Sequence, residues 1–453
     1  MQHQMSRRQF LGMVALSATG SALAACVPAG APPAQPGAAA PEAGQAAAPA
    51  AEGLSLRIGW WGGLSRNELY NQICDLYQEQ NPGTTLVREY AGWSDYWTKV
   101  ATQAAGGNLP DITASVIDTL SEYALRGAYA PMDPFIETGT IDVSDWNPMV
   151  LNSGKVADQV YMMPTGVTLN CIIMNQDLVK RAGLEPLPFE VTFDEFAAFT
   201  RQIQPELGAD TWATTNGGGY SEHFQSWILQ KGYQVANEDA TDVGFPREVA
   251  EEFFDYWYSL YTDGVVIPIE ISSQPLGDAW ADSFLAKGQV ACMYINSNQL
   301  KIFQQYTEDD LVIVRNPMMP DGVNRSGEYQ RPSALSIAAN TQYAEEVAKF
   351  INFFVNDIEA TRIFNMELGA VGPAHVQEAL RETIHPKDIL VLDHFNACLK
   401  DIPPKIPDPK GTAAVLAAHR RAAEAISYGT PIAEALDTFF AEAKDAYAVN
   451  QPA

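Results

Sequence analysis

Residues 54–68 read LSLRIGWWGGLSRNE, and this stretch contains the first strand, turn and helix of the fold. Leu54 to Ile58 alternates apolar and polar side chains, which predicts a strand. Ser65 is expected to cap the helix that follows, with Glu68 three residues later completing a capping box. The two glycines between them let the chain turn. The stretch therefore predicts the opening unit of an α/β fold.

Two adjacent tryptophans, Trp60 and Trp61, stand where this strand ends. Neighbouring side chains of a strand face opposite sides. We therefore expect one ring to pack inward and the other to face a binding site, and we favour Trp61 for the outward position. Because tryptophan is highly buried on average, packing of both rings in the core is the alternative.

The same alternation of strands and helices continues along the chain, which predicts a parallel sheet covered by helices. Expected strands are 84–90, 111–116, 167–174, 289–295 and 334–339, and expected helices are 96–105, 120–126, 176–182, 193–207, 246–263, 278–287, 342–355, 412–427 and 431–447. In the helix 193–207, Thr192 is the expected cap. Residues 54–453 are too many for one small core, so we expect two lobes.

The N-terminal segment has the features of an export signal. Arg7 and Arg8 precede a mildly apolar run, and small residues lead to Cys26. The paired arginines are typical of a twin-arginine signal, and the ending Leu-Ala-Ala-Cys resembles a lipobox in which Cys26 is lipidated. The apolar run is shorter than the roughly 20 residues of a membrane span. Residues 1–25 are thus the expected signal, and residues 26–53, rich in Ala, Pro and Gly, an expected disordered tether.

Charge and cysteine content exclude several classes of function. The chain has 28 basic and 55 acidic residues, a net charge of −27, which argues against a nucleic-acid partner. Cys74, Cys171, Cys292 and Cys398 show neither a CxxC pair nor a metal-like spacing, so we expect buried thiols and no metal or cofactor. We expect the membrane to be contacted only through the lipid of Cys26.

Eight short motifs occur in an order and spacing that resembles one family, the extracellular solute-binding proteins (family 1) of ABC importers, which include sugar- and oligosaccharide-binding lipoproteins. They are 60–63 (WWGG), 96–103 (YWTKVATQ), 107–112 (GNLPDI), 163–166 (MPTG), 192–196 (TFDEF), 284–293 (FLAKGQVACM), 348–354 (AKFINFF) and 369–373 (GAVGP). The resemblance covers nearly the whole chain. Two positions depart from the pattern that is common in such relatives: Asn67 stands in place of a histidine and Thr168 in place of an asparagine.

The resemblance implies a two-lobed clamp of the type II periplasmic-binding-protein class, which closes on its ligand by hinge motion. Lobe 1 would comprise residues 54–165 and 332–372, and lobe 2 residues 166–331 and 373–453. The implied crossings lie near 164–166, 331–332 and 372–373. The implied partners are a carbohydrate and the permease subunits of an ABC transporter. We expect a monomer at the outer face of the bacterial cell membrane, in the periplasm or on the cell surface.

A sugar site needs aromatic rings for the apolar face of the sugar and polar groups for its hydroxyls. The chain has 9 Trp and 18 Tyr, and several lie just past expected strands, where open α/β sheets bind ligands. The candidate rings are Trp60, Trp61, Trp93, Trp227 and Trp280. Trp280 is either a stacking platform or a packing residue. The glycine run 217–219 either lets the backbone approach a ligand or turns the chain.

The candidate polar groups stand near strand ends. Arg66 donates in a fixed fork, and the Asp118 carboxylate accepts two hydroxyl bonds; in relatives, an acid that binds sugar often follows the third strand. Asn296 and Asn298 follow the expected strand 289–295, and capping of the next helix is their alternative role.

Three functions fit these patterns to different degrees. A carbohydrate-binding protein is the first. A binding protein of the same fold for a polyamine, a peptide or a metal complex is the second, and the polyamine is the stronger competitor because the chain is acidic and aromatic. A secreted glycoside hydrolase is the third, and it would need two opposed carboxylates in a cleft. We expect a binding protein, not an enzyme.

Overall fold

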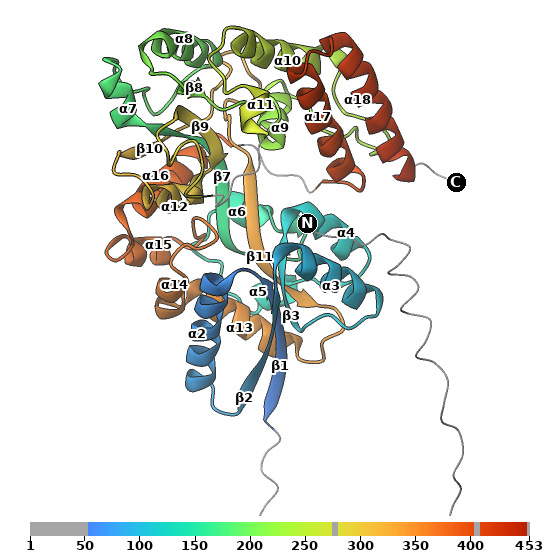
Figure 1. Cartoon of the computed structure of the whole chain (residues 1–453). Coiled ribbons are helices and arrows are strands. Elements are labelled where there is room, and N and C mark those ends of the chain that lie inside the picture. The colour runs from blue at the N-terminus through green and yellow to red at the C-terminus, as the bar shows by residue number, and fades with distance from the viewer. Residues whose placement is uncertain (1–52, 274–279, 403–407, 451–453) are drawn as a thin grey trace, which may run out of the picture. The chain divides into compact units, whose positions relative to one another are not determined.

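A computed structural model describes residues 53–273, 280–402 and 408–450 (Figure 1). The expected signal 1–25, the lipidation site Cys26 and the tether 26–53 lie outside the described residues, apart from Gly53. Among the helices of the described part, none combines the length and the apolar character that a membrane span requires.

Eleven strands are present in the described part of the chain, most of them in one mixed sheet. They are β1 (Leu54–Trp61), β2 (Thr84–Ala91), β3 (Ile112–Val116), β4 (Tyr129–Ala130), β5 (Lys155–Val156), β6 (Gln159–Val160), β7 (Met163–Asn175), β8 (Trp212–Thr214), β9 (Val290–Asn296), β10 (Leu311–Val314) and β11 (Gln330–Ala338). The order in the main sheet is β2-β1-β3-β11-β7-β9-β8, with β10 on β7 and β4 on β11. Strands β5 and β6 form a separate hairpin.

Helices cover this sheet along its whole length (Figure 1). Those up to residue 272 are α2 (Leu64–Gln80), α3 (Trp93–Ala105), α4 (Ile117–Leu125), α5 (Asp133–Glu137), α6 (Pro148–Asn152), α7 (Gln176–Arg181), α8 (Phe193–Ile203), η1 (Gln204–Glu206), α9 (Ser221–Gln230), α10 (Arg247–Thr262) and α11 (Ile269–Ser272). The later ones are η2 (Ser297–Gln299), α12 (Leu300–Gln304), α13 (Ala344–Asn356), α14 (Ile358–Phe364), α15 (Ala374–Arg381), α16 (Pro386–Cys398), α17 (Thr412–Ser427), α18 (Ile432–Tyr447) and η3 (Ala448–Asn450).

Strand β7 joins the two halves of the sheet. Its first half pairs with β11 and its second half with β9 and β10, all antiparallel. At about 3.3 Å per residue, a strand of 13 residues is long enough to serve both halves. A third segment runs beside it, because the backbone groups of Val167 and Ala370 exchange hydrogen bonds of 2.8 and 2.9 Å. The three segments that we expected to cross between lobes therefore lie side by side.

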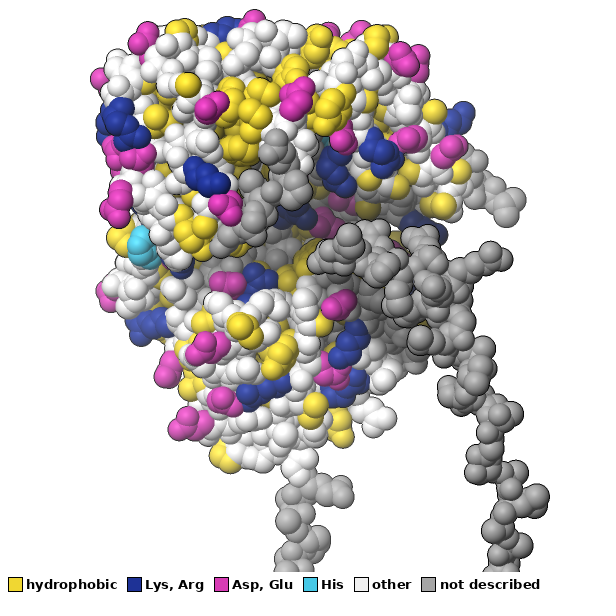
Figure 2. Space-filling model, viewed as in Figure 1, with side chains coloured by type: hydrophobic (Ala, Val, Ile, Leu, Met, Phe, Trp, Pro, Cys, Tyr) yellow, Lys and Arg dark blue, Asp and Glu magenta, His cyan; other side chains and the backbone are white. Residues whose placement is uncertain are grey.

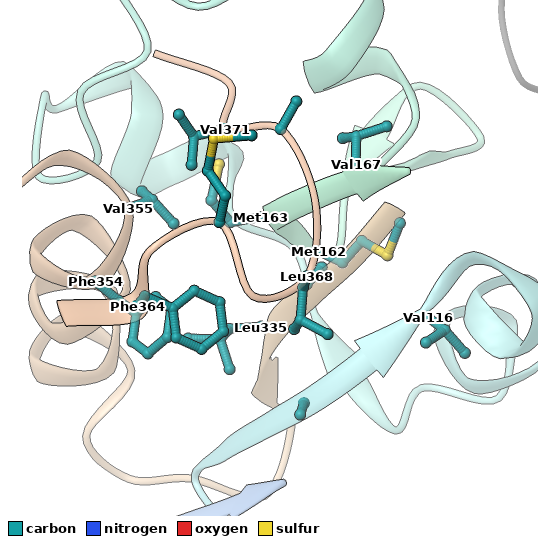
Figure 3. Packing of buried hydrophobic residues seen from close by; sticks show 14 of the residues in the cluster. Val116, Met162, Met163, Val167, Leu335, Phe354, Val355, Phe364, Leu368 and Val371 are labelled. Carbon is teal, nitrogen blue, oxygen red and sulfur yellow. The ribbon is translucent and has the colours of Figure 1, made fainter. Parts of the chain in front are cut away.

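Two apolar cores lie on opposite faces of the second half of β7. Along β7, Cys171 and Ile173 face one core, while Ile172 and Met174 face the other. The first core continues into the half of the sheet formed by β1, β2 and β3; Figure 3 shows side chains of β3, β7 and β11 packing there with those of α13 and α14. The second core lies under α8, α9, α10, α17 and α18. The four described cysteines are buried and free, which confirms their expected packing role.

Most of the expected helices and strands are present, and where a predicted helix start is wrong, the structure shows the physical reason. The capping box of α8 is confirmed, since Thr192 and Glu195 exchange both bonds. The expected cap at Ser65 is wrong: α2 begins at Leu64 with Gly63 as its cap. Strand β1 continues through both tryptophans, and the Gly62 N–H still donates to the Ala91 carbonyl. The bend therefore falls one residue before Leu64.

The expected helix 278–287 is also wrong in the part that the structure describes. Residues 280–287 form successive turns instead of a regular helix. The Ser283 hydroxyl accepts from the Ala286 N–H, a local bond that competes with helical pairing.

Candidate functional site

Strands β1, β2 and β3 are parallel, so their carboxyl ends meet at one edge of the sheet. Open α/β sheets bind ligands at such an edge. Trp61 ends β1, Trp93 begins the helix after β2, and Asp118 lies in the first turn of the helix after β3. Three of the predicted site residues are thus brought to one edge.

Trp60 belongs to the core and not to this edge. Its side chain has no exposed surface, and its ring stacks between Tyr70 and Tyr90 at centroid distances of 4.7 and 5.1 Å. The indole N–H donates to the Asn67 side chain at 2.9 Å. The prediction of Trp60 as a ligand-binding residue is therefore wrong in this structure. Asn67, one of the two departures from the family pattern, thus accepts the hydrogen bond of this buried indole.

The outward ring is Trp93 and not Trp61. Trp61 is only 6% exposed and packs among Trp93, Tyr96 and Trp97, whereas Trp93 is 50% exposed. The side chains of β1 do alternate, but helix α2 covers one face of the strand and α3 covers the other. Trp61 instead supports Trp93, whose ring it meets edge-on at a centroid distance of 5.3 Å.

Asp118 is ion-paired with Arg331, an arginine near the start of β11. The Arg331 guanidinium donates to Asp118 at 2.6 Å and also to Glu222 in the first turn of α9. Burial alone would lower the pKa of Arg331, but the two carboxylates raise it above its ordinary value. Arg331 therefore stays charged and connects a helix that follows β3 with a helix of the second core.

A cavity of about 250 Å³ adjoins this ion pair. Its lining comes from α4, α9, β11 and the start of α17, and it includes Gln225, Tyr329 and Arg420 besides the three charged residues. In the view of Figure 2, the surface is hollowed between the upper and lower parts of the molecule, and basic and acidic side chains lie at the margins of the hollow. The cavity can offer a ligand both hydrogen-bond donors and acceptors.

None of the predicted rings lines this cavity, and Trp93 lies elsewhere on the same sheet edge. The Trp227 indole N–H donates to the Val249 carbonyl at 3.0 Å, and its ring packs in the second core against Phe193 and Phe253. Trp280 packs on Phe303 at a centroid distance of 5.6 Å, which is the packing alternative. The ligand-binding prediction for Trp227 is wrong in this structure, since the ring is only 7% exposed.

The remaining polar candidates have mixed environments. Arg66, in the first turn of α2, donates to Glu367 at 3.0 Å. Asn296 ends β9 and makes no side-chain cap, so its capping alternative is wrong; its Oδ1 atom is buried without a hydrogen-bond partner in the described structure. Asn298 lies half-buried in the short helix η2. None of the three lines the 250 Å³ cavity.

The glycine run 217–219 serves packing. A Cβ atom on Gly217 would lie 2.2 Å from the ring of Trp257. The glycines therefore let the backbone approach a tryptophan of the second core, not a ligand.

Several cavity residues escaped prediction, namely Glu222, Gln225, Tyr329, Arg331 and Arg420. They come from elements far apart in sequence and have no shared motif. Arg331 alone could have been found from the sequence, because residues 331–332 were expected to cross between the lobes. A charged side chain at such a crossing lies near both lobes and can contact a ligand between them.

Comparison with known proteins agrees with this architecture. A family model described as bacterial extracellular solute-binding protein matches residues 72–376. A protein of Brucella abortus (strain 2308), whose name describes it only as a binding protein, is 23% identical over 295 residues, which cover 63% of this chain and 67% of that protein.

Two solved structures have the same fold. The first is an extracellular solute-binding protein family 1 from Alicyclobacillus acidocaldarius (TM-score 0.73, 22% identity, 88% of this chain and all of the other). The second is a periplasmic oligogalacturonide binding protein from Yersinia enterocolitica in complex with saturated digalacturonic acid (TM-score 0.74, 21% identity, 88% of this chain and all of the other). The fold is thus the mixed α/β fold of periplasmic solute-binding proteins, and with two thirds of its length matched by the family model, the chain belongs to the bacterial extracellular solute-binding protein family.

Proposed function

We propose that this protein captures a carbohydrate between two lobes, 54–165 with 332–372 and 166–331 with 373–453, and delivers it to the permease of an ABC transporter. Cys26 would carry a lipid that holds the protein at the outer face of the cell membrane. The Yersinia neighbour, which binds an oligosaccharide derivative, supports this assignment of ligand class.

The half-exposed ring of Trp93 carries the proposal. It stands at the carboxyl edge of three parallel strands and is held by the buried ring of Trp61. An exposed, rigid indole offers a flat apolar surface for the C–H face of a sugar. At the same edge, the Asp118 and Arg331 side chains offer an acceptor and a donor for hydroxyl groups.

The ion pairs of the cavity favour a sugar over a polyamine. Asp118 and Glu222 both contact the Arg331 guanidinium, so a polyamine would have to displace that charge to reach them. The same contacts weigh against a glycoside hydrolase. A hydrolase needs two carboxyl groups that flank the scissile bond, whereas Asp118 and Glu222 both contact the Arg331 guanidinium.

The test is binding by the exported domain, residues 54–453, to a panel of oligosaccharides, measured by calorimetry and thermal shift. Trp93→Ala should weaken binding on the order of 30-fold, the loss of about 2 kcal/mol that is typical of a central aromatic contact. Tyr428→Ala, which removes a 58% exposed ring at the end of α17, is the matched control and should bind normally. Stabilisation by polyamines alone, or full affinity in Trp93→Ala, would overturn the proposal.

The lipid anchor needs its own test. Cys26→Ser should release the full-length protein from the membrane fraction, while the wild type stays bound after a high-salt wash. Equal release of both proteins would contradict anchoring through Cys26.

A further inference from the structure

Two helices begin at the wall of the 250 Å³ cavity. Ser221 and Glu222 at the start of α9, and Gly411 and Ala413 at the start of α17, all line it. Neither helix has a side-chain cap. Within the described residues, the backbone N–H groups of Ser221, Glu222 and Ala413 have no acceptor. Two positive helix ends with free donors thus face one cavity, which favours a negative group there.

Two cations of the cavity have no acid partner among the described residues. Arg420, more than two turns into α17, donates to the Ser221 hydroxyl at 2.8 Å and has no carboxylate within 4.0 Å in the described structure. Lys410 also lines the cavity, and its ammonium group has no acid partner among the described residues. Two positive charges are therefore free to pair with a ligand.

Four carboxylates line the cavity, and three of them are paired with an arginine. Asp118 and Glu222 are both held by Arg331, and Glu122 pairs with Arg126 at 2.6 Å within α4. The fourth, Asp408, lies before α17 and accepts from the Tyr329 hydroxyl at 3.5 Å. The positive charges that this cavity offers a ligand are therefore those of Arg420 and Lys410.

A buried acceptor points to the rest of the ligand. The Gln225 side chain lines the cavity, is 3% exposed, and has an Oε1 atom without a hydrogen-bond partner in the described structure. A buried polar atom costs free energy unless it is hydrogen-bonded. A hydroxyl group of a ligand can donate to this atom, while an anionic group beside it accepts from Arg420.

We infer that the ligand is an acidic oligosaccharide, whose carboxylate or sulfate group binds Arg420 and the N-terminus of α9, which the Arg420–Ser221 contact brings together. The inference rests on the proposed function, because it assumes that this cavity belongs to the carbohydrate site. It adds the charge of the sugar and the residues that recognise that charge. Since Arg331 already holds the nearby carboxylates, the anionic group approaches from the α17 side.

The decisive comparison uses one skeleton with and without charge. Digalacturonic acid and its dimethyl ester are titrated into the domain 54–453, with sodium sulfate as a third probe. The acid should bind at least about tenfold more tightly than the ester, as expected for a charge-assisted hydrogen bond. Its affinity should fall as the salt concentration rises.

Two adjacent arginines of α17 supply the variants. Arg420→Gln should weaken binding of the acid roughly tenfold or more and leave binding of the ester unchanged. Arg421→Gln is the matched control, because Arg421 is paired with Glu442 on α18, outside the cavity, and its loss should change neither affinity by more than about twofold. Circular dichroism checks that both variants fold.

The outcomes separate the two proposals. Equal binding of acid and ester, or tight binding only of neutral oligosaccharides, would overturn the inference and leave the carbohydrate function standing. No binding of any saccharide would overturn both. Binding of sulfate as tight as that of the acid would show a site for a free anion and would also overturn the inference.

Discussion

Two arginines lie near the two ends of the segment that connects β10 to β11: Arg315 directly after β10 and Arg331 in β11. Both pair with carboxylates, but in different surroundings. Arg315 is 1% exposed and lies bidentate against Glu328, which has no exposed surface, with N–O distances of 3.1 and 2.9 Å. Arg331 is 34% exposed and is shared between Asp118 and Glu222. One arginine is fixed within the protein interior, and the other faces a cavity.

The difference lies in how completely each carboxylate is satisfied. Glu328 also accepts from the Ser326 hydroxyl and the Asn316 backbone, so its oxygens have four donors. A buried charge pair of this kind is costly to break, because the remaining charge has no water. Asp118 is 40% exposed and accepts only from Arg331 in the described structure. Water or a ligand hydroxyl can replace that bond at little cost, which suits a binding site.

Removal of the buried carboxylate should have the largest effect. Glu328→Gln leaves the Nε and Nη2 groups of Arg315 buried beside a neutral amide, while its Nη1 group keeps Glu190 and Asp401. We therefore expect the free energy of unfolding to fall by about 3 kcal/mol, the lower end for a broken buried pair. Urea unfolding followed by circular dichroism measures it. Glu252→Gln, which removes the α10 partner of Lys231 in a partly exposed pair, is the control and should cost less than about 1 kcal/mol. If both variants lose the same free energy of unfolding, the buried pair contributes no more to stability than the exposed pair, which would contradict the comparison.

Acid should break the same pair in the wild type. Burial alone would raise the pKa of Glu328, but the His394 ring and the hydrogen bonds and charge of Arg315 lower it to about 2, from 4.5. A lowered pKa stabilises the fold fully above the unfolded value, so this contribution should be lost as the pH falls from about 4.5 to about 2. Urea midpoints across this range should therefore fall more steeply for the wild type than for Glu328→Gln. Parallel curves would show that Glu328 does not titrate in this window.

The elements of the fold could be predicted from the sequence, because their signals are local. The helices 412–427 and 431–447 have strong periodicity and confirmed bounds to within one residue. The capping box at Thr192 has a mechanism that acts over three residues. The joining of both halves of the sheet through β7 was not predicted, since pairing with β11 and β9 depends on residues more than 100 positions away.

The candidate site could be predicted only in part, for the same reason. Asp118 was found because it follows a strand. Trp61 was preferred to Trp93 because alternation along a strand says which faces two side chains take, but not which helices cover those faces. Arg331 and Arg420 were not found, because their partners on α4 and α9 come from distant parts of the chain. The lobe boundaries and the lipid anchor stay predictions.

Removal of the Asp118–Arg331 ion pair should change the free energy of unfolding little and the affinity for sugar strongly. In Asp118→Asn, Arg331 keeps Glu222 and its access to water, so we expect the free energy of unfolding to change by less than about 1 kcal/mol. Affinity for an oligosaccharide that binds the wild type should fall about tenfold, since a charged acceptor for its hydroxyls is replaced by a neutral one. Urea unfolding and calorimetry on one preparation measure both quantities. A loss of 3 kcal/mol or more, with affinity unchanged, would mean that Arg331 holds the fold together as Arg315 does, and that this cavity is not where the sugar binds.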